Sequence, residues 1–287
     1  MKKILALIFV LVFSSCSNGA NMNHSGDMSE MDHGEEMTSD TEAYTESLSD
    51  SPRHQEWVEI DNDGKTIHAF VVYPENKTKS SAVIMIHENK GLNDWARSMA
   101  DQVAAEGYIV VAPDLLSSFD DEREMTSDFD SPDDATQALY TLDQQDIDSD
   151  LAAVSAYAQS IESYNGNLVS AGFCWGGAQS FNMAAQDDDL KASLVFYGTP
   201  PEDESAYSEI DIPVYGFYGE NDERINSTIA ATEENMSENG KIYEYEIYPG
   251  AGHAFMRNAQ SDDADEPTIE ARNNAFERMK NILSEYN

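Results

Sequence analysis

Val169-Ser170-Ala171-Gly172-Phe173-Cys174-Trp175-Gly176-Gly177-Ala178 is the stretch of sequence that decides the fold. The apolar run at 168–171 predicts a short buried strand, and residues 177–185 predict a helix. Cys174 lies in the turn between them, with Gly172 two residues before it and Gly176 two residues after it. Glycine at these positions removes side chains that would collide with the neighbouring strand and helix. The stretch therefore predicts a strand, a sharp turn that displays a cysteine, and a helix.

This arrangement resembles the nucleophile elbow of α/β-hydrolases, the pattern Gly-x-Ser-x-Gly, with cysteine in place of serine. The helix that follows would point its N-terminal N–H groups and its positive dipole end at Cys174, which favours the thiolate. A buried structural cysteine in a glycine-rich turn is the alternative interpretation, because short motifs also occur by chance.

The charge of the chain limits its partners. Its 287 residues include 16 Lys and Arg against 55 Asp and Glu, a formal net charge of −39. Binding to a phosphate backbone requires a basic patch, so this balance argues against a nucleic-acid partner. Hydrophobic residues make up 40% of the chain, which is enough for a sizeable core.

The N terminus has the pattern of an export signal. Residues 1–3 are Met-Lys-Lys, and residues 4–13 form an unbroken apolar run that is too short for an ordinary transmembrane helix. The sequence Ser14-Ser15-Cys16 resembles a bacterial lipobox, which implies cleavage before Cys16 and lipidation of that residue. We therefore predict a signal peptide at 1–15 and a lipid-anchored protein of the cell envelope, in the periplasm or at the cell surface. An ordinary cleaved signal peptide is the alternative.

Lipidation of Cys16 would leave Cys174 as the one free thiol of the mature chain, because the sequence has two cysteines. Exported proteins usually use their cysteines in disulfides, so a solitary thiol is a candidate nucleophile.

Residues 16–55 are acidic and polar, with no helix or strand period, and predict a disordered tether. Methionine and histidine recur in this segment, and thioether and imidazole ligands suit Cu(I)-like ions. Their spacing defines no site, so a plain tether is favoured, and a metal-handling lipoprotein stays open as an alternative. The residues concerned are Met22, His24, Met28, Met31, His33 and Met37.

Residues 56–287 alternate between predicted strands and helices. Two β-rich runs, 57–60 and 66–73, flank an Asp-Asn-Asp-Gly turn and predict a hairpin. The remaining alternation predicts an α/β fold with a single doubly wound, mainly parallel sheet and helices on both faces. Further strands are predicted at 82–86, 108–112, 192–197, 214–218 and 243–248, and helices at 94–105, 148–163 and 267–286.

Two loops that follow predicted strands carry an acid and a histidine. Asp222 follows the strand at 214–218, with Glu220 as a rival acid, and His253 follows the strand at 243–248. Open α/β sheets bind ligands at the carboxyl ends of their strands, where these loops lie. A nucleophile needs a base, and the base needs an orienting acid. The order Cys174, Asp222, His253 matches the order nucleophile, acid, histidine of α/β-hydrolases and predicts a catalytic triad.

Four segments together resemble the dienelactone hydrolase family: 86–91, 172–177, 218–222 and 251–257. The resemblance extends from about Trp57 to the C terminus and implies the α/β-hydrolase fold. It implies that Cys174 is the nucleophile, His253 the base and Asp222 its orienting acid. It further implies that Glu88 is the carboxylate that contacts and controls the resting thiol.

The same resemblance implies that the backbone N–H groups of Asn89 and Trp175 form the oxyanion hole. It also implies that Arg257 holds a carboxylate of the substrate, a task suited to a guanidinium group. The family often has a second such arginine shortly after its Pro-Asp-Leu motif. Here Pro113–Leu116 is followed by Ser117 and Ser118, and the next arginine is Arg123, so a dienelactone substrate is not implied.

We therefore predict an exported, lipid-anchored hydrolase of small carboxylic esters or lactones that uses a Cys-His-Asp triad through an acyl-enzyme. It would touch the membrane through its lipid only, act as a monomer, and need neither metal nor organic cofactor. Its parts would be a signal peptide (1–15), a tether (16–55) and a dienelactone hydrolase-like domain (56–287). The alternative from another class is a non-catalytic binding module on the same fold.

Overall fold

The computed structural model describes residues 43–75 and 79–287. The predicted signal peptide, Cys16 and the methionines and histidines from Met22 to Met37 lie outside these ranges. Within them, no helix is both long and apolar enough to cross a membrane.

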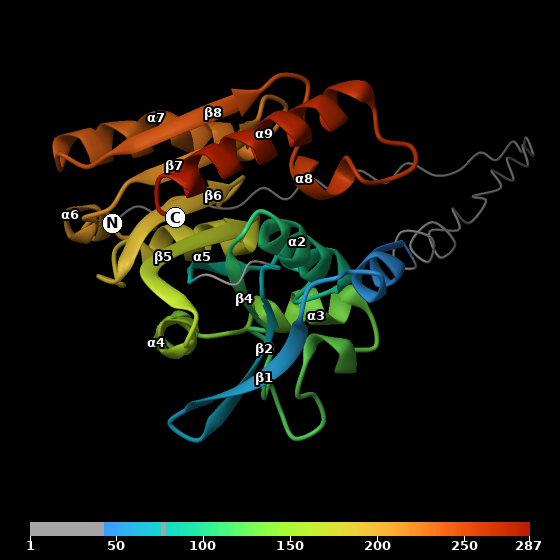
Figure 1. Ribbon diagram of the computed structural model, residues 1–287. Coiled ribbons are helices and arrows are strands. Elements are labelled where there is room, and N and C mark those ends of the chain that lie inside the picture. Colours follow the sequence, from blue (N-terminus) through green and yellow to red (C-terminus); the bar gives the residue numbers. More distant parts are fainter. Residues whose placement is uncertain (1–42, 76–78) are drawn as a thin grey trace, which may run out of the picture.

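One eight-stranded sheet organises the described residues (Figure 1). Its strands lie in the order β1-β2-β4-β3-β5-β6-β7-β8. The β1/β2 and β2/β4 pairs are antiparallel and all the others are parallel, so the prediction of a mainly parallel sheet is confirmed. The strands are β1 (Gln55–Asn62), β2 (Lys65–Val72), β3 (Ser80–Ile86), β4 (Ile109–Pro113), β5 (Tyr164–Phe173), β6 (Leu190–Phe196), β7 (Val214–Gly219) and β8 (Tyr243–Tyr248).

Helices cover both faces of the sheet, as predicted for a doubly wound fold. The core on one face joins α2 and α9 to alternate strand residues such as Val83 and Met85, and the core on the other face joins α4 to Ala82 and Ile84. Central strands are apolar on both sides because both sides are covered. The helices are α2 (Asp94–Ala105), α3 (Pro132–Leu139), α4 (Gln144–Ser160), α5 (Trp175–Met183), α6 (Ala206–Glu209), α7 (Glu223–Glu238), α8 (Phe255–Asn258) and α9 (Glu266–Ser284), with a 3₁₀ turn at Thr126–Asp128.

The helix α7 was not among the predicted elements. Its sequence is largely polar, and only four of its residues are buried, so a hydrophobic pattern hardly marks it. Its start is set by Asp222, whose side chain accepts a hydrogen bond from the N–H of Ile225. The acid predicted for the triad is therefore also the N-cap of this helix.

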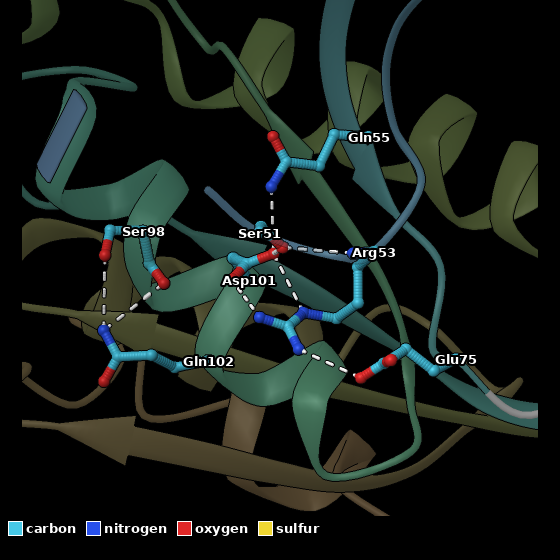
Figure 2. Close-up of polar contacts among 7 residues, drawn as sticks. All are labelled: Ser51, Arg53, Gln55, Glu75, Ser98, Asp101 and Gln102. Atoms are coloured by element: carbon cyan, nitrogen blue, oxygen red, sulfur yellow. Dashed lines mark hydrogen bonds and ion pairs between the residues drawn. The ribbon is translucent and has the colours of Figure 1, made fainter. Parts of the chain in front are cut away.

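Ordered structure begins earlier than the predicted domain start at residue 56. Residues 43–49 are helical, and Tyr44 and Leu48 pack against the core that contains α2. Arg53 forms an ion pair with Asp101 of α2, which is 4% exposed (Figure 2). The prediction of a disordered tether is therefore wrong for residues 43–55. The contacts that order this segment join residues about fifty positions apart, and a local sequence pattern does not report them.

Candidate active site

The turn at Cys174 has the geometry that the glycine spacing indicated. Cys174 has φ 55° and ψ −113°, a conformation that a residue with a side chain adopts at an energetic cost. A Cβ atom at Gly172 would lie 1.8 Å from the carbonyl oxygen of Gly176, and one at Gly176 would lie 2.3 Å from that of His87. Only glycine permits this approach, and β5 can pass directly into α5 with the thiol at the carboxyl edge of the sheet.

The three residues predicted as a triad lie in one hydrogen-bonded chain. His253 Nε2 is 3.1 Å from Cys174 Sγ, and His253 Nδ1 is 2.5 Å from Asp222 Oδ2. Asp222 is buried, whereas the side chain of His253 is about one-third exposed. The rival acid Glu220 instead accepts a hydrogen bond from the N–H of Gly250, which braces the loop that carries His253.

Two backbone N–H groups point at the thiol, and they are the pair expected for an oxyanion hole. Burial raises the pKa of Cys174, and the negative charge of Glu88 raises it further. Hydrogen bonds from the N–H groups of Trp175 and Asn89, and the charge of Arg224, act in the opposite direction but do not offset this. The sequence indicated that the start of α5 favours the thiolate, and this influence is present but is outweighed. The resting group is a protonated thiol, so a base must remove its proton.

Glu88 lies close to the thiol but is held by other groups. Its carboxylate is 4% exposed and accepts hydrogen bonds from Arg257 Nε at 2.8 Å and from the hydroxyl of Tyr197 at 3.1 Å. Burial lowers the pKa of Arg257, but the charge and hydrogen bond of Glu88 raise it overall. Within the described part of the chain, no hydrogen bond joins Glu88 to Cys174, so the carboxylate acts on the thiol through its charge.

His87 is a residue of the site that the sequence analysis did not single out. Its Nε2 accepts the N–H of Leu115 at 3.2 Å, so the proton of the neutral ring lies on Nδ1, which donates to the carbonyl oxygen of Glu88 at 2.7 Å. Burial lowers the pKa of His87 and keeps the ring neutral. The carbonyl of Glu88 and the N–H of Asn89 belong to one peptide group, so His87 fixes the direction of that N–H. The sequence feature that could have indicated this role is the position of His87 directly before Glu88.

A groove of about 1100 Å³ lies on the Arg257 side of the site, and Cys174, His253 and Asp222 are not among the described residues that line it. Arg257 lines it, and so does Lys90, which directly follows Asn89. Four aromatic residues are among those that line it: Tyr44, Trp57, Trp95 and Phe129.

Arg123 does not take the place of the arginine that the family often has after its Pro-Asp-Leu motif. Its guanidinium pairs with Asp120 and lies over the rings of Phe119 and Phe129. It is not one of the described residues that line the groove. The cations of the groove wall are Lys90, Arg97 and Arg257.

No cluster of three or more metal-ligating side chains is present in residues 43–75 and 79–287. The methionines and histidines from Met22 to Met37 lie outside these ranges, so the metal-handling alternative has no structural description.

The mainly parallel sheet, with a Cys-His-Asp chain at the carboxyl ends of its strands, defines an α/β-hydrolase. A solved structure of a putative dienelactone hydrolase from Klebsiella pneumoniae subsp. pneumoniae has the same fold, with a TM-score of 0.71 and 23% identity. It is matched over 82% of this chain and 99% of its own.

The chain belongs to the dienelactone hydrolase family, whose family model matches residues 67–287. It is 30% identical to a "Putative carboxymethylenebutenolidase" of Saccharolobus solfataricus over 252 residues, which are 78% of this chain and 95% of the relative. It is 25% identical to a protein of the same name from Methylorubrum extorquens, over 80% of each chain. The protein is thus a hydrolase that acts on ester or lactone bonds.

Proposed function

We propose that the protein hydrolyses small carboxylic esters or lactones through a thioester intermediate on Cys174. The observation that carries this proposal is the continuous chain from Cys174 Sγ through His253 to Asp222, with contacts of 3.1 and 2.5 Å. Nucleophile, base and orienting acid stand within hydrogen-bond reach of one another, as acyl transfer requires.

In the first half of the reaction, His253 Nε2 takes the proton of the Cys174 thiol as sulfur attacks the carbonyl carbon. The carbonyl oxygen becomes an oxyanion and is held by the N–H groups of Asn89 and Trp175. As the tetrahedral intermediate collapses, the bond to the ester oxygen breaks, and His253 returns the proton to the departing alkoxide. The alcohol leaves, or stays attached at the far end of an opened lactone.

In the second half, water attacks the thioester, and His253 accepts one of its protons. The oxyanion forms again at the same two N–H groups. The carbon–sulfur bond then breaks, the free acid forms, and His253 returns the proton to the Cys174 thiolate. Asp222 stabilises the imidazolium in both halves by accepting the hydrogen bond from Nδ1.

Arg257 is the residue we assign to recognition of an acidic group on the substrate. Arg257 lines the groove. Its hydrogen bond to Glu88 uses Nε, which leaves the two terminal NH2 groups of the guanidinium to bind an acidic group of the substrate. A carboxylate that binds there would sit next to Glu88 and compete for the same cation.

The location of this activity is also part of the proposal. Removal of residues 1–15 and lipidation of Cys16 would hold the hydrolase at the cell envelope as a monomer. The lipobox-like Ser14-Ser15-Cys16 supports this assignment.

Intact-mass spectrometry of the protein mixed with an activated ester tests the catalytic proposal. The wild-type chain should gain the mass of one acyl group and lose it again as product accumulates. Cys174→Ala should gain no mass and release no product above the buffer rate. Tyr140→Ala, at a tyrosine that is 64% exposed and does not line the groove, serves as the control for handling and fold.

Two results would contradict the proposal in different ways. An acyl group carried by the Cys174→Ala protein would show that another residue is the nucleophile. A wild-type adduct that forms once and is never released would identify a binding module instead of an enzyme.

A further inference from the structure

The N-terminal arm, which we define as residues 43–55, is fastened to α2 through one buried carboxylate. Asp101 of α2 accepts hydrogen bonds from Ser51 Oγ at 2.6 Å, Arg53 Nε at 2.9 Å and Gln55 Nε2 at 2.9 Å (Figure 2). Arg53 also reaches the second carboxylate oxygen at 2.5 Å, so the pair is bidentate. Three arm residues thus converge on one group of the folded domain.

The charge state of Asp101 keeps this attachment strong. Burial raises the pKa of Asp101, but the hydrogen bonds from Arg53, Ser51 and Gln55 lower it overall. The carboxylate is therefore ionised at neutral pH, and its bonds to Arg53 are charge-assisted. Because Asp101 and the side chain of Arg53 are both largely buried, solvent screens this pair less than a surface pair.

Upstream of this attachment, the helical part of the arm lies at the start of α2. Thr45 Oγ1 donates a 2.6 Å hydrogen bond to Asp94, the first residue of α2. Tyr44 and Leu48 pack against the core cluster that includes Trp95 and Met99. The arm therefore runs along α2 from Asp101 to the helix start, which is where the groove lies.

Tyr44 is the arm residue that reaches the groove. It lines the wall together with Arg257, and its phenol adds to the electrostatic interactions of that guanidinium. Trp95 lines the same groove and is 2% exposed, and its indole Nε1 has no hydrogen-bond partner among the described residues.

The size of the groove exceeds what a small lactone needs. Pockets for ligands of drug size measure about 300–1000 Å³, and this groove measures about 1100 Å³. Aromatic walls bind a large apolar group well, because ring contacts add to the burial of area.

We propose that Tyr44 is a specificity-determining residue, and that the groove it lines takes esters with a bulky, aryl-bearing group. The inference rests on the proposed ester hydrolysis at Cys174 for the position of the scissile bond. Tyr44 lies outside residues 67–287, so the family match does not supply this wall. The N-terminal arm is then part of the substrate site and not only a connection to an anchor.

Binding measured without turnover tests the inference. In a Cys174→Ala background, calorimetry would give the Kd of the methyl ester of naphthylpropanoic acid. Tyr44→Ala should weaken this Kd about fivefold, the size expected for one lost aromatic contact. Tyr44→Phe should bind as the parent does. Tyr140→Ala, at a tyrosine that is 64% exposed and outside the groove, is the matched control.

A substitution outside the groove tests whether the attachment of the whole arm, and not only the Tyr44 side chain, affects binding. Arg53→Gln should speed hydrogen exchange of the amides at 43–50 and weaken the Kd as Tyr44→Ala does. Lys241→Gln, which breaks an ion pair with Asp211 outside the groove, should do neither.

Equal Kd values for Tyr44→Ala and Tyr140→Ala would overturn the inference. The inference would also be overturned if hydrogen exchange showed that Arg53→Gln releases the arm while the Kd stayed unchanged. If Tyr44→Ala weakened binding and Tyr140→Ala did not, while the wild-type chain hydrolysed no ester, the proposed function would be wrong. The arm would still form part of a binding site.

Discussion

The thiol of Cys174 is subject to two opposing influences. Burial and the charge of Glu88 favour the protonated form, while two backbone N–H groups and Arg224 favour the thiolate. Burial and the charge of Glu88 have the larger effect on the pKa of Cys174. The resting thiol is therefore a weak nucleophile, and its proton must pass to His253. An exposed thiolate reacts readily with oxidants, and a buried, protonated thiol is less readily oxidised.

Arg257 is the residue whose role is decided by comparing charged and neutral substrates. We expect Arg257→Ala to raise KM for a monoester of a dicarboxylic acid about tenfold or more, since a hydrogen bond to a charged group contributes about 1.5–3 kcal/mol. The neutral amide of the same ester should change much less. Loss of the cation beside Glu88 affects both substrates alike, so their ratio isolates recognition of the carboxylate.

Steady-state kinetics on the matched pair gives this ratio. Lys241→Ala is the control, because Lys241 pairs with Asp211 and neither residue lines the groove. If Arg257→Ala slowed both esters by the same factor, the assignment to the substrate carboxylate would be wrong, and Arg257 would serve only to hold Glu88.

At the scale of elements, the turn between β5 and α5 depends on glycine at defined points. A Cβ at Gly172 would lie 1.8 Å from the carbonyl oxygen of Gly176, which is backbone and cannot swing away. We expect Gly172→Ala to lower the free energy of unfolding by about 3 kcal/mol or more, or to prevent folding, because overpacking against backbone has no cheap relaxation.

Denaturant unfolding followed by circular dichroism measures this change. Gly252→Ala is the matched control, since a Cβ there would meet no described atom within 4 Å. Near-equal stabilities of the two variants would mean that the turn can open without cost, and the strained geometry at Cys174 would then not be enforced by packing.

At the scale of the whole molecule, the acidity of the chain extends into the groove. The chain carries a formal charge of −39, and five aspartates line the groove beside its three cations. Salt screens the field of distant charges beyond about 8–10 Å, whereas a contact with a guanidinium is screened little. An acidic substrate is therefore repelled weakly at a distance and can still be recognised at contact.

The proposed lipid anchor also belongs to the scale of the whole molecule. We expect the mature protein to start at a lipidated Cys16 and to fractionate with membranes, and Cys16→Ala to move it to the soluble fraction or leave it unprocessed. Mass spectrometry of the N-terminal peptide checks this. A wild-type N terminus that begins after Cys16 and carries no lipid would exclude the anchor.

The sequence by itself determined the features that depend on local pattern. Apolar runs marked the strands β3, β4 and β6 because both faces of the sheet are covered, and glycine spacing marked the turn at Cys174 because backbone passes close by. The order of cysteine, acid and histidine indicated the candidate triad before any distance was known. A pattern of this kind reports which residues are buried or sterically constrained.

Only the tertiary structure decided the contacts between distant segments. Glu220 and Asp222 follow the same strand, and the family resemblance favoured Asp222; the fold gives the contacts, Asp222 with His253 and Glu220 with the N–H of Gly250. Whether the pKa of Cys174 is raised or lowered depends on burial and on Glu88, which lies on another loop. The order of the N-terminal arm depends on Asp101, forty-eight positions beyond Arg53. Such contacts depend on how the sheet and its helices pack in space, and no short-range sequence pattern reports that packing.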